Sequence, residues 1–357
     1  MRWWQVAALA LVGAPLLAAG AAITWAEQRL DRRWIVPARE IPAPWPPDER
    51  GLAEIRDDRL RALEDVHERQ NRTAAFSISP GSTGPSIRFE PFVPPADPLA
   101  GVDLDAYARK RAVARGRHLV HDRLGCATCH GEDFGGSVPV DDLPVLRLAA
   151  PNITPAGVVA GWSVADWDRI VRHGVLRGGR TAWMPSADYA GLSDRELSDL
   201  VSYLETVPPV ERPSGATEVG FVGKLLVAVG VIPLVAEIID HEAAPPAEEP
   251  PYGPTAAYGA HLGQTCAGCH GQGLSGGPIP GAPPEWKEAS NLTPAPDGLA
   301  GWTEAQFLSF LADGERPDGT RVDPSMPLAL TRGLDPTEGR ALWAWLRSVP
   351  ARPRGGR

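Results

Sequence analysis

Cysteine, methionine and lysine are scarce in this chain of 357 residues. The four cysteines all lie within two short motifs, so none is left over for a disulfide bond. Lysine occurs three times and the net charge is −9, which excludes a basic nucleic-acid-binding face, and we predict no nucleic-acid partner. Proline and glycine, with 38 residues each, are plentiful and predict long irregular connections.

The two cysteine motifs read Cys126-Ala-Thr-Cys129-His130 and Cys266-Ala-Gly-Cys269-His270. C-x-x-C-H is the covalent attachment signature of c-type haem. On a helical turn, positions i, i+3 and i+4 share one face, so two thiols can bond to the porphyrin edge while the imidazole reaches the iron. A structural zinc site needs four ligands, and a redox dithiol does not need the histidine. We therefore predict two covalently bound haem c groups, with His130 and His270 as axial ligands.

Only two methionines follow Met1, and they occupy matching places in the chain. Met184 lies 58 residues after the first cysteine of its motif and Met326 lies 60 after the first cysteine of the other, and each precedes a proline. Methionine is a common sixth ligand of haem iron, although it also fills gaps in cores. The nearest histidine alternative in the first motif's domain is His173, which we expect to be solvated at a helix end, since its counterpart is Asp313. We predict Met184 and Met326 as the second axial ligands.

The chain after residue 98 is an internal repeat. Asn152-Ile-Thr-Pro matches Asn291-Leu-Thr-Pro, and Gly161-Trp162 matches Gly301-Trp302, at offsets near 140 residues. Helix-start signals follow in both copies, with apolar positions at helical spacing behind them. The cap pairs are Ser163 with Asp166, Ser193 with Glu196, Thr303 with Gln306, and Asp335 with Glu338. We predict two tandem all-α haem domains at about 99–212 and 252–353.

Other polar and aromatic residues that the two copies share are candidates for contacts with the haem or for structural roles. We expect the matched asparagines and tryptophans to line the haem edge or the propionates, with core packing as the alternative for the tryptophans. We expect the matched histidines of the first helices to have a packing or structural role, and two loop arginines to pair with propionates. These residues are Asn152, Asn291, Trp162, Trp302, His118, His261, Arg180 and Arg321.

The N-terminal 98 residues contain neither motif. Residues 3–26 form an uncharged stretch of 24 residues, and about 20 suffice to span a bilayer, so we predict a transmembrane anchor within residues 1–30. A cleaved signal peptide, ending near Ala19-Gly20-Ala21, is the alternative. Residues 31–98 read as a proline-rich spacer with one charged helical stretch at 48–72. Residues 213–251 read as a linker with a short apolar helix at 221–239 rather than a second span.

The C-x-x-C-H motifs and the methionines resemble those of tandem class I c-type cytochromes. The repeated Asn-Ile/Leu-Thr-Pro, Gly-Trp and Met-Pro motifs resemble those of the cytochrome subunits of membrane-bound alcohol and sugar-acid dehydrogenases. The chain differs by having two haem motifs where three are usual, and by its N-terminal extension. The resemblance implies an electron carrier rather than an enzyme, bound to the inner membrane with its haems on the periplasmic side. Its partners would be redox proteins, including a membrane dehydrogenase or oxidase complex. The alternatives are a dihaem peroxidase or sulfur-compound oxidoreductase with one open haem, and a tethering subunit of a larger redox complex.

Overall fold

The computed structural model describes residues 3–37, 39–76, 91–282 and 285–356. The chain divides into two compact units, one of residues 44–111 and the other of residues 1–43 with 112–357. The smaller unit contains α2 (Glu49–Phe76) and the start of α3 (Leu104–His118), and Arg111 of α3 pairs with Glu54 of α2. The helix predicted within 48–72 is thus confirmed. Residues 77–90 of the predicted spacer lie outside the described residues.

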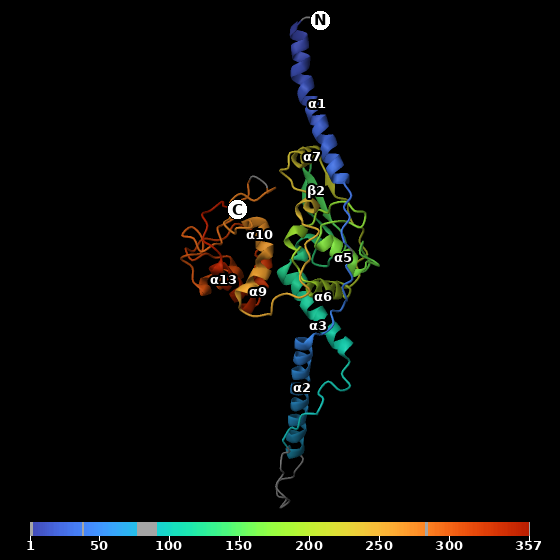
Figure 1. The fold of residues 1–357 in the computed structure, drawn as a ribbon, viewed down its shortest axis with the longest axis vertical. Helices are drawn as coiled ribbons and strands as arrows, with labels where there is room; N and C mark the ends of the chain where they lie inside the picture. The colour runs from blue at the N-terminus through green and yellow to red at the C-terminus, as the bar shows by residue number, and fades with distance from the viewer. Residues whose placement is uncertain (1–2, 38, 77–90, 283–284, 357) are drawn as a thin grey trace, which may run out of the picture. The chain divides into compact units, whose positions relative to one another are not determined.

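In the larger unit, α1 (Trp3–Asp31) packs against α7 (Phe221–Ala228). Figure 1 shows the end of α1 beside α7. Ala26 of α1 is buried against Val227 and Leu234, and Arg29 pairs with Glu237 of the short helix α8 (Val235–Ile238). The short apolar helix predicted after residue 220 is therefore present. Within the described ranges, no helix is both long enough and apolar enough to cross a membrane, so the predicted transmembrane helix is not supported.

The rest of the larger unit consists of two similar arrangements, which we call the first half (residues 112–214) and the second half (residues 252–356). The first half runs through the end of α3, a π-helical turn at Leu119–Arg123, α4 (Cys126–His130), α5 (Val164–Val171), a 3-10 turn at Ser186–Asp188 and α6 (Asp194–Leu204). The second half runs through α9 (Ala256–Leu262), a 3-10 turn at Gly263–Cys266, α10 (Ala267–His270), α11 (Glu304–Asp313), α12 (Ala329–Arg332) and α13 (Pro336–Ser348).

All four predicted capping boxes form. In each, the N-cap side chain accepts a hydrogen bond from the N3 backbone and the N3 side chain accepts one from the N-cap backbone, before α5, α6, α11 and α13. The apolar stripes behind them are buried in the cores of the two halves. They include Trp167, Leu197, Leu200 and Val201 in the first half, and Phe307, Leu311, Leu342 and Leu346 in the second.

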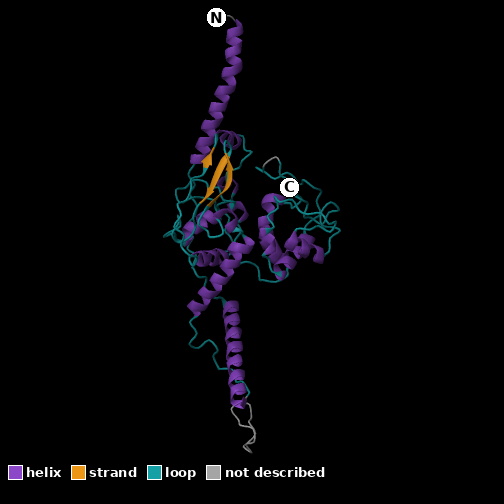
Figure 2. Ribbon diagram, turned by 180° about the vertical axis from the view of Figure 1, so that it is seen from behind, coloured by secondary structure: helices purple, strands orange, loops and turns teal. Residues whose placement is uncertain are grey.

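The prediction of an all-α fold is wrong in one respect. A three-stranded antiparallel sheet is present, in which β2 (Leu146–Ala150) pairs with both β1 (Ser137–Asp142) and β3 (Glu218–Val219) (Figure 2). A tight turn joins β1 to β2, with Val145 N–H donating to Asp142 O at 2.8 Å. These strands have six, five and two residues, too few to show a period in the sequence, and the β3 partner is remote. The second half has a bridge between Gly277 and Ala289 at the corresponding place.

Candidate haem sites

Each motif histidine is held by a backbone carbonyl. His130 Nδ1 lies 2.8 Å from Pro151 O, and His270 Nδ1 lies 2.7 Å from Ser290 O. A carbonyl only accepts, so Nδ1 carries the proton and donates, and Nε2 is the ring nitrogen that carries the lone pair of the neutral imidazole. This is the tautomer of a histidine that ligates a metal through Nε2. Burial also lowers the pKa of His130, although the hydrogen bond to Pro151 acts in the opposite direction.

The repeated asparagines fix these carbonyls in place. Asn152, which follows Pro151, is buried, and its Nδ2 donates to Val210 O at 2.6 Å while its Oδ1 accepts from Thr154 N–H at 2.9 Å. Asn291, which follows Ser290, makes the corresponding bonds to Arg352 O at 2.8 Å and from Thr293 N–H at 2.9 Å. Each asparagine thus ties the histidine's partner carbonyl to the segment that follows the last helix of its half. The sequence predicted both asparagines at the haem edge or the propionates, whereas the hydrogen bonds described here hold the backbone beside the motif histidines.

Replacing Asn152 with alanine should lower the free energy of unfolding by about 1–3 kcal/mol, because the Thr154 and Val210 backbone groups would lose a buried partner. Urea denaturation of the haem-loaded protein would measure this. The matched control is Ser348→Ala, whose exposed hydroxyl bonds the Trp345 carbonyl at 2.7 Å. A loss no larger than that of the control would contradict the role of Asn152.

Met184 and Met326 follow equivalent loops. A bridge between Val175 and Thr181 and a bridge between Glu315 and Arg321 close the two loops, which begin at Gly174 and Gly314 in the left-handed region. After Met184, the buried Ser186 hydroxyl donates to Ile170 O at 2.7 Å. After Met326, the Thr331 hydroxyl donates to Leu311 O at 2.8 Å. Each methionine is therefore held between the loop and the helix that precedes it.

A cavity of about 630 Å³ brings the predicted residues of the second half together. Cys266, Cys269, His270 and Met326 all line it. Its remaining walls are largely apolar, with Arg316 and Arg321 also contributing, and the apolar lining includes Leu262, Leu292, Phe307, Phe310, Leu311 and Leu346. Volume, apolar walls and a few converging donors are the properties of a cofactor site. The donor set of two thiols, an imidazole that is protonated at Nδ1 and a thioether fits a covalently attached haem.

The first thiol of each motif is protonated at neutral pH in the chain without haem. Burial raises the pKa of Cys126 to about 12 and that of Cys266 to about 11, so both stay protonated at neutral pH. A thiolate, rather than a thiol, is the species that attacks disulfides or binds zinc. The raised pKa values of Cys126 and Cys266 therefore make a redox dithiol unfavourable here. Among the described residues, no group of three or more His, Cys, Asp and Glu side chains is placed to hold a metal ion.

In the first half, the α4 motif lies beside the segment that follows Met184. The Tyr189 hydroxyl donates to Leu124 O at 3.0 Å, two residues before Cys126. Burial raises the pKa of Tyr189 well above its usual value, and the neighbouring thiols of Cys126 and Cys129 act in the same direction. The chain after Met184 therefore returns to the cysteine motif. Tyr189 is a neighbour of the motif that the sequence did not indicate, because its counterpart in the second half is Thr331.

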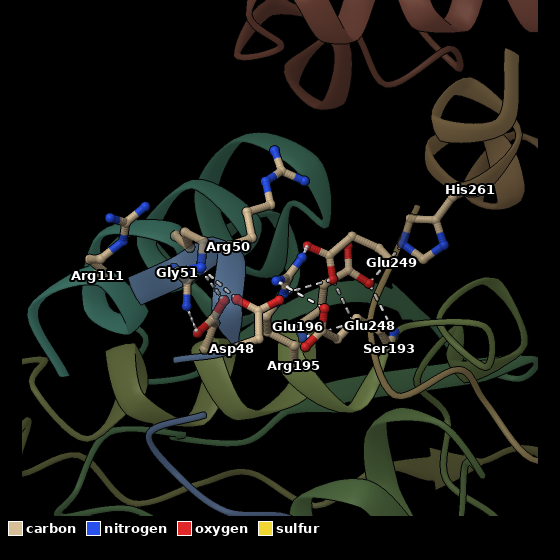
Figure 3. Close-up of polar contacts among 12 residues, drawn as sticks. Asp48, Arg50, Gly51, Arg111, Ser193, Arg195, Glu196, Glu248, Glu249 and His261 are labelled. Atoms are coloured by element: carbon tan, nitrogen blue, oxygen red, sulfur yellow. Dashed lines mark hydrogen bonds and ion pairs between the residues drawn. The ribbon is translucent and has the colours of Figure 1, made fainter. Parts of the chain in front are cut away.

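The matched histidines of the first helices connect the two halves. His118 Nε2 lies 2.9 Å from Glu338 Oε2, and His261 Nε2 lies 2.8 Å from Glu196 Oε2 (Figure 3 shows the second contact). The two contacts are reciprocal, since each histidine reaches the capping-box glutamate of the other half. A structural role for both histidines is thereby confirmed, and the contacts between halves are something that the sequence did not predict.

Glu196 is the more strongly held of the two glutamates. Its carboxylate also pairs with Arg123 at 2.8 Å, and both side chains are buried. Burial acts to raise the pKa of Glu196, but Arg123 and His261 outweigh it and lower that pKa to about 2. The adjoining Ser193 hydroxyl donates to Glu249 at 2.8 Å, so this cluster also holds the linker before the second half (Figure 3).

The remaining predicted residues lie in varied surroundings. His173 is buried and its Nδ1 is 3.1 Å from His241 Nδ1, so the prediction that it is solvated is wrong. Arg180 pairs with Asp31 at 3.6 Å, whereas Arg321 lines the cavity. The two tryptophans pack edge-on against aromatic rings, Trp162 against Trp167 and Trp302 against Phe310. Packing is therefore the role that the structure gives them.

Comparison with known proteins agrees with this chemistry. Residues 113–208, within the first half, match the family model described as Cytochrome c. The chain is a relative of cytochrome c electron-transfer proteins.

Three relatives show the range of this similarity. The chain is 25% identical to the fructose dehydrogenase cytochrome subunit of Gluconobacter japonicus, over 70% of this chain and 55% of that protein. It is 29% identical to a diheme cytochrome c-type protein of Cereibacter sphaeroides, over 64% of this chain and 82% of that protein. It is 24% identical to the cytochrome c subunit of a quinone alcohol dehydrogenase of Gluconacetobacter polyoxogenes, over 65% and 55%. The match thus spans little more than half the length of the two dehydrogenase subunits.

Proposed function

We propose that the chain is a dihaem c-type cytochrome that carries electrons between redox proteins. The observation that supports this most directly is the cavity of the second half, which gathers Cys266, Cys269, His270 and Met326 around one space. The first half repeats the same residues as Cys126, Cys129, His130 and Met184. Bound haem supplies a one-electron couple between ferrous and ferric iron.

The chain's own residues hold and insulate that couple. The cysteines anchor the porphyrin, and the carbonyls of Pro151 and Ser290 orient the two imidazoles through Nδ1. The methionines would supply the second protein ligand of each iron, and a thioether would raise the reduction potential relative to a harder donor. Apolar side chains such as Phe307 and Leu311 keep water from the cofactor.

We further propose that the chain serves as the cytochrome subunit of a dehydrogenase complex or of a related membrane redox complex. Relatives named as cytochrome subunits of fructose, gluconate and alcohol dehydrogenases support this. The donor would be the partner's redox centre, and the acceptor another electron carrier. We place the haem sites on the periplasmic side of the inner membrane, which cell fractionation with accessibility labelling would test.

Haem content tests the two-haem proposal. The mass of the purified protein should exceed that of the apoprotein by two haems, and acidic organic solvent should not extract the colour. Cys126→Ser with Cys129→Ser should leave one haem, and Cys266→Ser with Cys269→Ser should leave the other, so each double variant is the control for its partner. A single covalent haem in the unaltered protein, or colour lost to the solvent, would overturn the proposal.

A further inference from the structure

The two cysteine motifs face the interface between the halves. Asp188 of the first half lies against Gly268, inside the second motif, where an added Cβ would lie 2.5 Å from Asp188 Oδ1. In the other direction, Leu330 of the second half packs against Gly125, directly before the first motif. Each half therefore contributes side chains to the surroundings of the other half's haem site, and Arg123, Leu124 and Leu192 of the first half also line the second-half cavity.

These two side chains are equivalent in the repeat but opposite in chemistry. Asp188 follows Met184 by four residues, and Leu330 follows Met326 by four. Asp188 lines the cavity that holds Cys266, Cys269, His270 and Met326. We propose, resting on the dihaem function above, that the Asp188 carboxylate lowers the reduction potential of the haem in the second half, and that no such charge is supplied in return to the first half, where Leu330 stands.

The charge on Asp188 is present at neutral pH. Burial raises the pKa of Asp188 to about 6, which leaves the carboxyl mostly ionised at pH 7. A negative charge beside the cofactor stabilises the ferric form, which carries one more positive charge than the ferrous form, and partial burial keeps this interaction from being fully screened. Other charged side chains also line the cavity, and three of its cations are paired with carboxylates: Arg123 with Glu196 at 2.8 Å, Lys287 with Asp323 at 3.6 Å and Arg354 with Glu288 at 3.1 Å. Arg316 and Arg321 act in the opposite direction to Asp188, but Arg321 is exposed and Arg316 is half-buried, so solvent screens them.

The difference between Asp188 and Leu330 would favour electron transfer in one direction between the two halves. When one electron passes between the halves, the iron that gives it up goes from ferrous to ferric and the other iron goes from ferric to ferrous, with no bond formed or broken. The Asp188 carboxylate biases this exchange toward a reduced first half. Electrons entering through the second half would therefore be favoured to move on to the first.

The test uses the full haem-loaded chain at pH 7 and its two one-electron potentials, measured by voltammetry. Asp188→Asn preserves the shape of the side chain, and Asp188→Leu makes the two halves alike. Both should raise one potential and leave the other nearly unchanged. Met326→His in the same background identifies the second-half haem, because that change alters its potential alone. Glu211→Gln, which removes one negative charge from an exposed site of the first half, is the control and should shift neither.

The outcomes are distinct. A rise confined to the Met326-ligated haem in both Asp188 variants supports the proposal. Unchanged potentials, equal shifts of both haems, or a shift of the first-half haem alone would overturn it, with two haems still present by mass. Fewer than two covalent haems in the unaltered chain would instead remove the dihaem function on which the proposal rests.

Discussion

Met326→His should lower the reduction potential of the second-half haem by a sizeable part of the roughly 0.8 V range that axial ligands span, because imidazole stabilises ferric iron more than a thioether does. Met184→His should do the same to the first-half haem. Since the two methionines lie in separate halves, each change should leave the other potential almost untouched. Redox titration followed by visible absorbance would measure both, and the weak far-red band of methionine-ligated ferric haem should diminish in each variant.

Each methionine variant is the control for the other. The expected result requires that both haems of the unaltered protein are low-spin and six-coordinate. A resting high-spin haem that binds cyanide or peroxide readily would mean that one methionine is not a ligand. An open site of that kind would favour the peroxidase alternative over an electron carrier.

Glu196→Gln should destabilise the protein by about 3–5 kcal/mol, because it leaves the buried guanidinium of Arg123 without its charged partner. Glu338→Gln should cost less, since its partner His118 is one-third exposed. The two also differ in pH dependence. The depressed pKa of Glu196 makes its stabilisation complete above about pH 4.5 and lost as the pH falls toward 2.

Glu338 acts on His118, so its pH dependence has the opposite sign. The hydrogen bond to Glu338 raises the pKa of His118, so that stabilisation is complete below about pH 6.5 and is lost as the pH rises through the raised value. Denaturant unfolding of both variants and the unaltered protein across pH 3–9 would measure this, with Glu211→Gln as the exposed control. Equal costs for the two variants at all pH values would contradict the assignment of these contacts.

Local features of the fold were predictable because their causes are local. The capping boxes are set by residues three apart, and the haem motifs occupy single helical turns, so the sequence contains all the information they need. The duplicated methionines were also recognisable because Met1 is the only other methionine of the chain. The cavity gathers Met326 with Cys266, Cys269 and His270, in agreement with that spacing.

The contacts between remote segments were not predictable in this way. β2 pairs with β3 about 70 residues later, and His118 meets Glu338 after 220 residues. Nothing in the pattern around a histidine tells which carboxylate it reaches, so their structural role could be stated but not their partners. The burial of His173 was missed for the same reason, since its neighbour His241 comes from the linker between the halves.

The reciprocal histidine contacts have a consequence for how the chain unfolds. Glu196 and Glu338 each close the first turn of a helix in their own half and at the same time bind a histidine of the other half. Fraying of either helix would therefore release a contact that the opposite half depends on. We therefore expect the two halves to unfold as one cooperative unit, so that a destabilising substitution in either half would disturb the cysteine motifs of both.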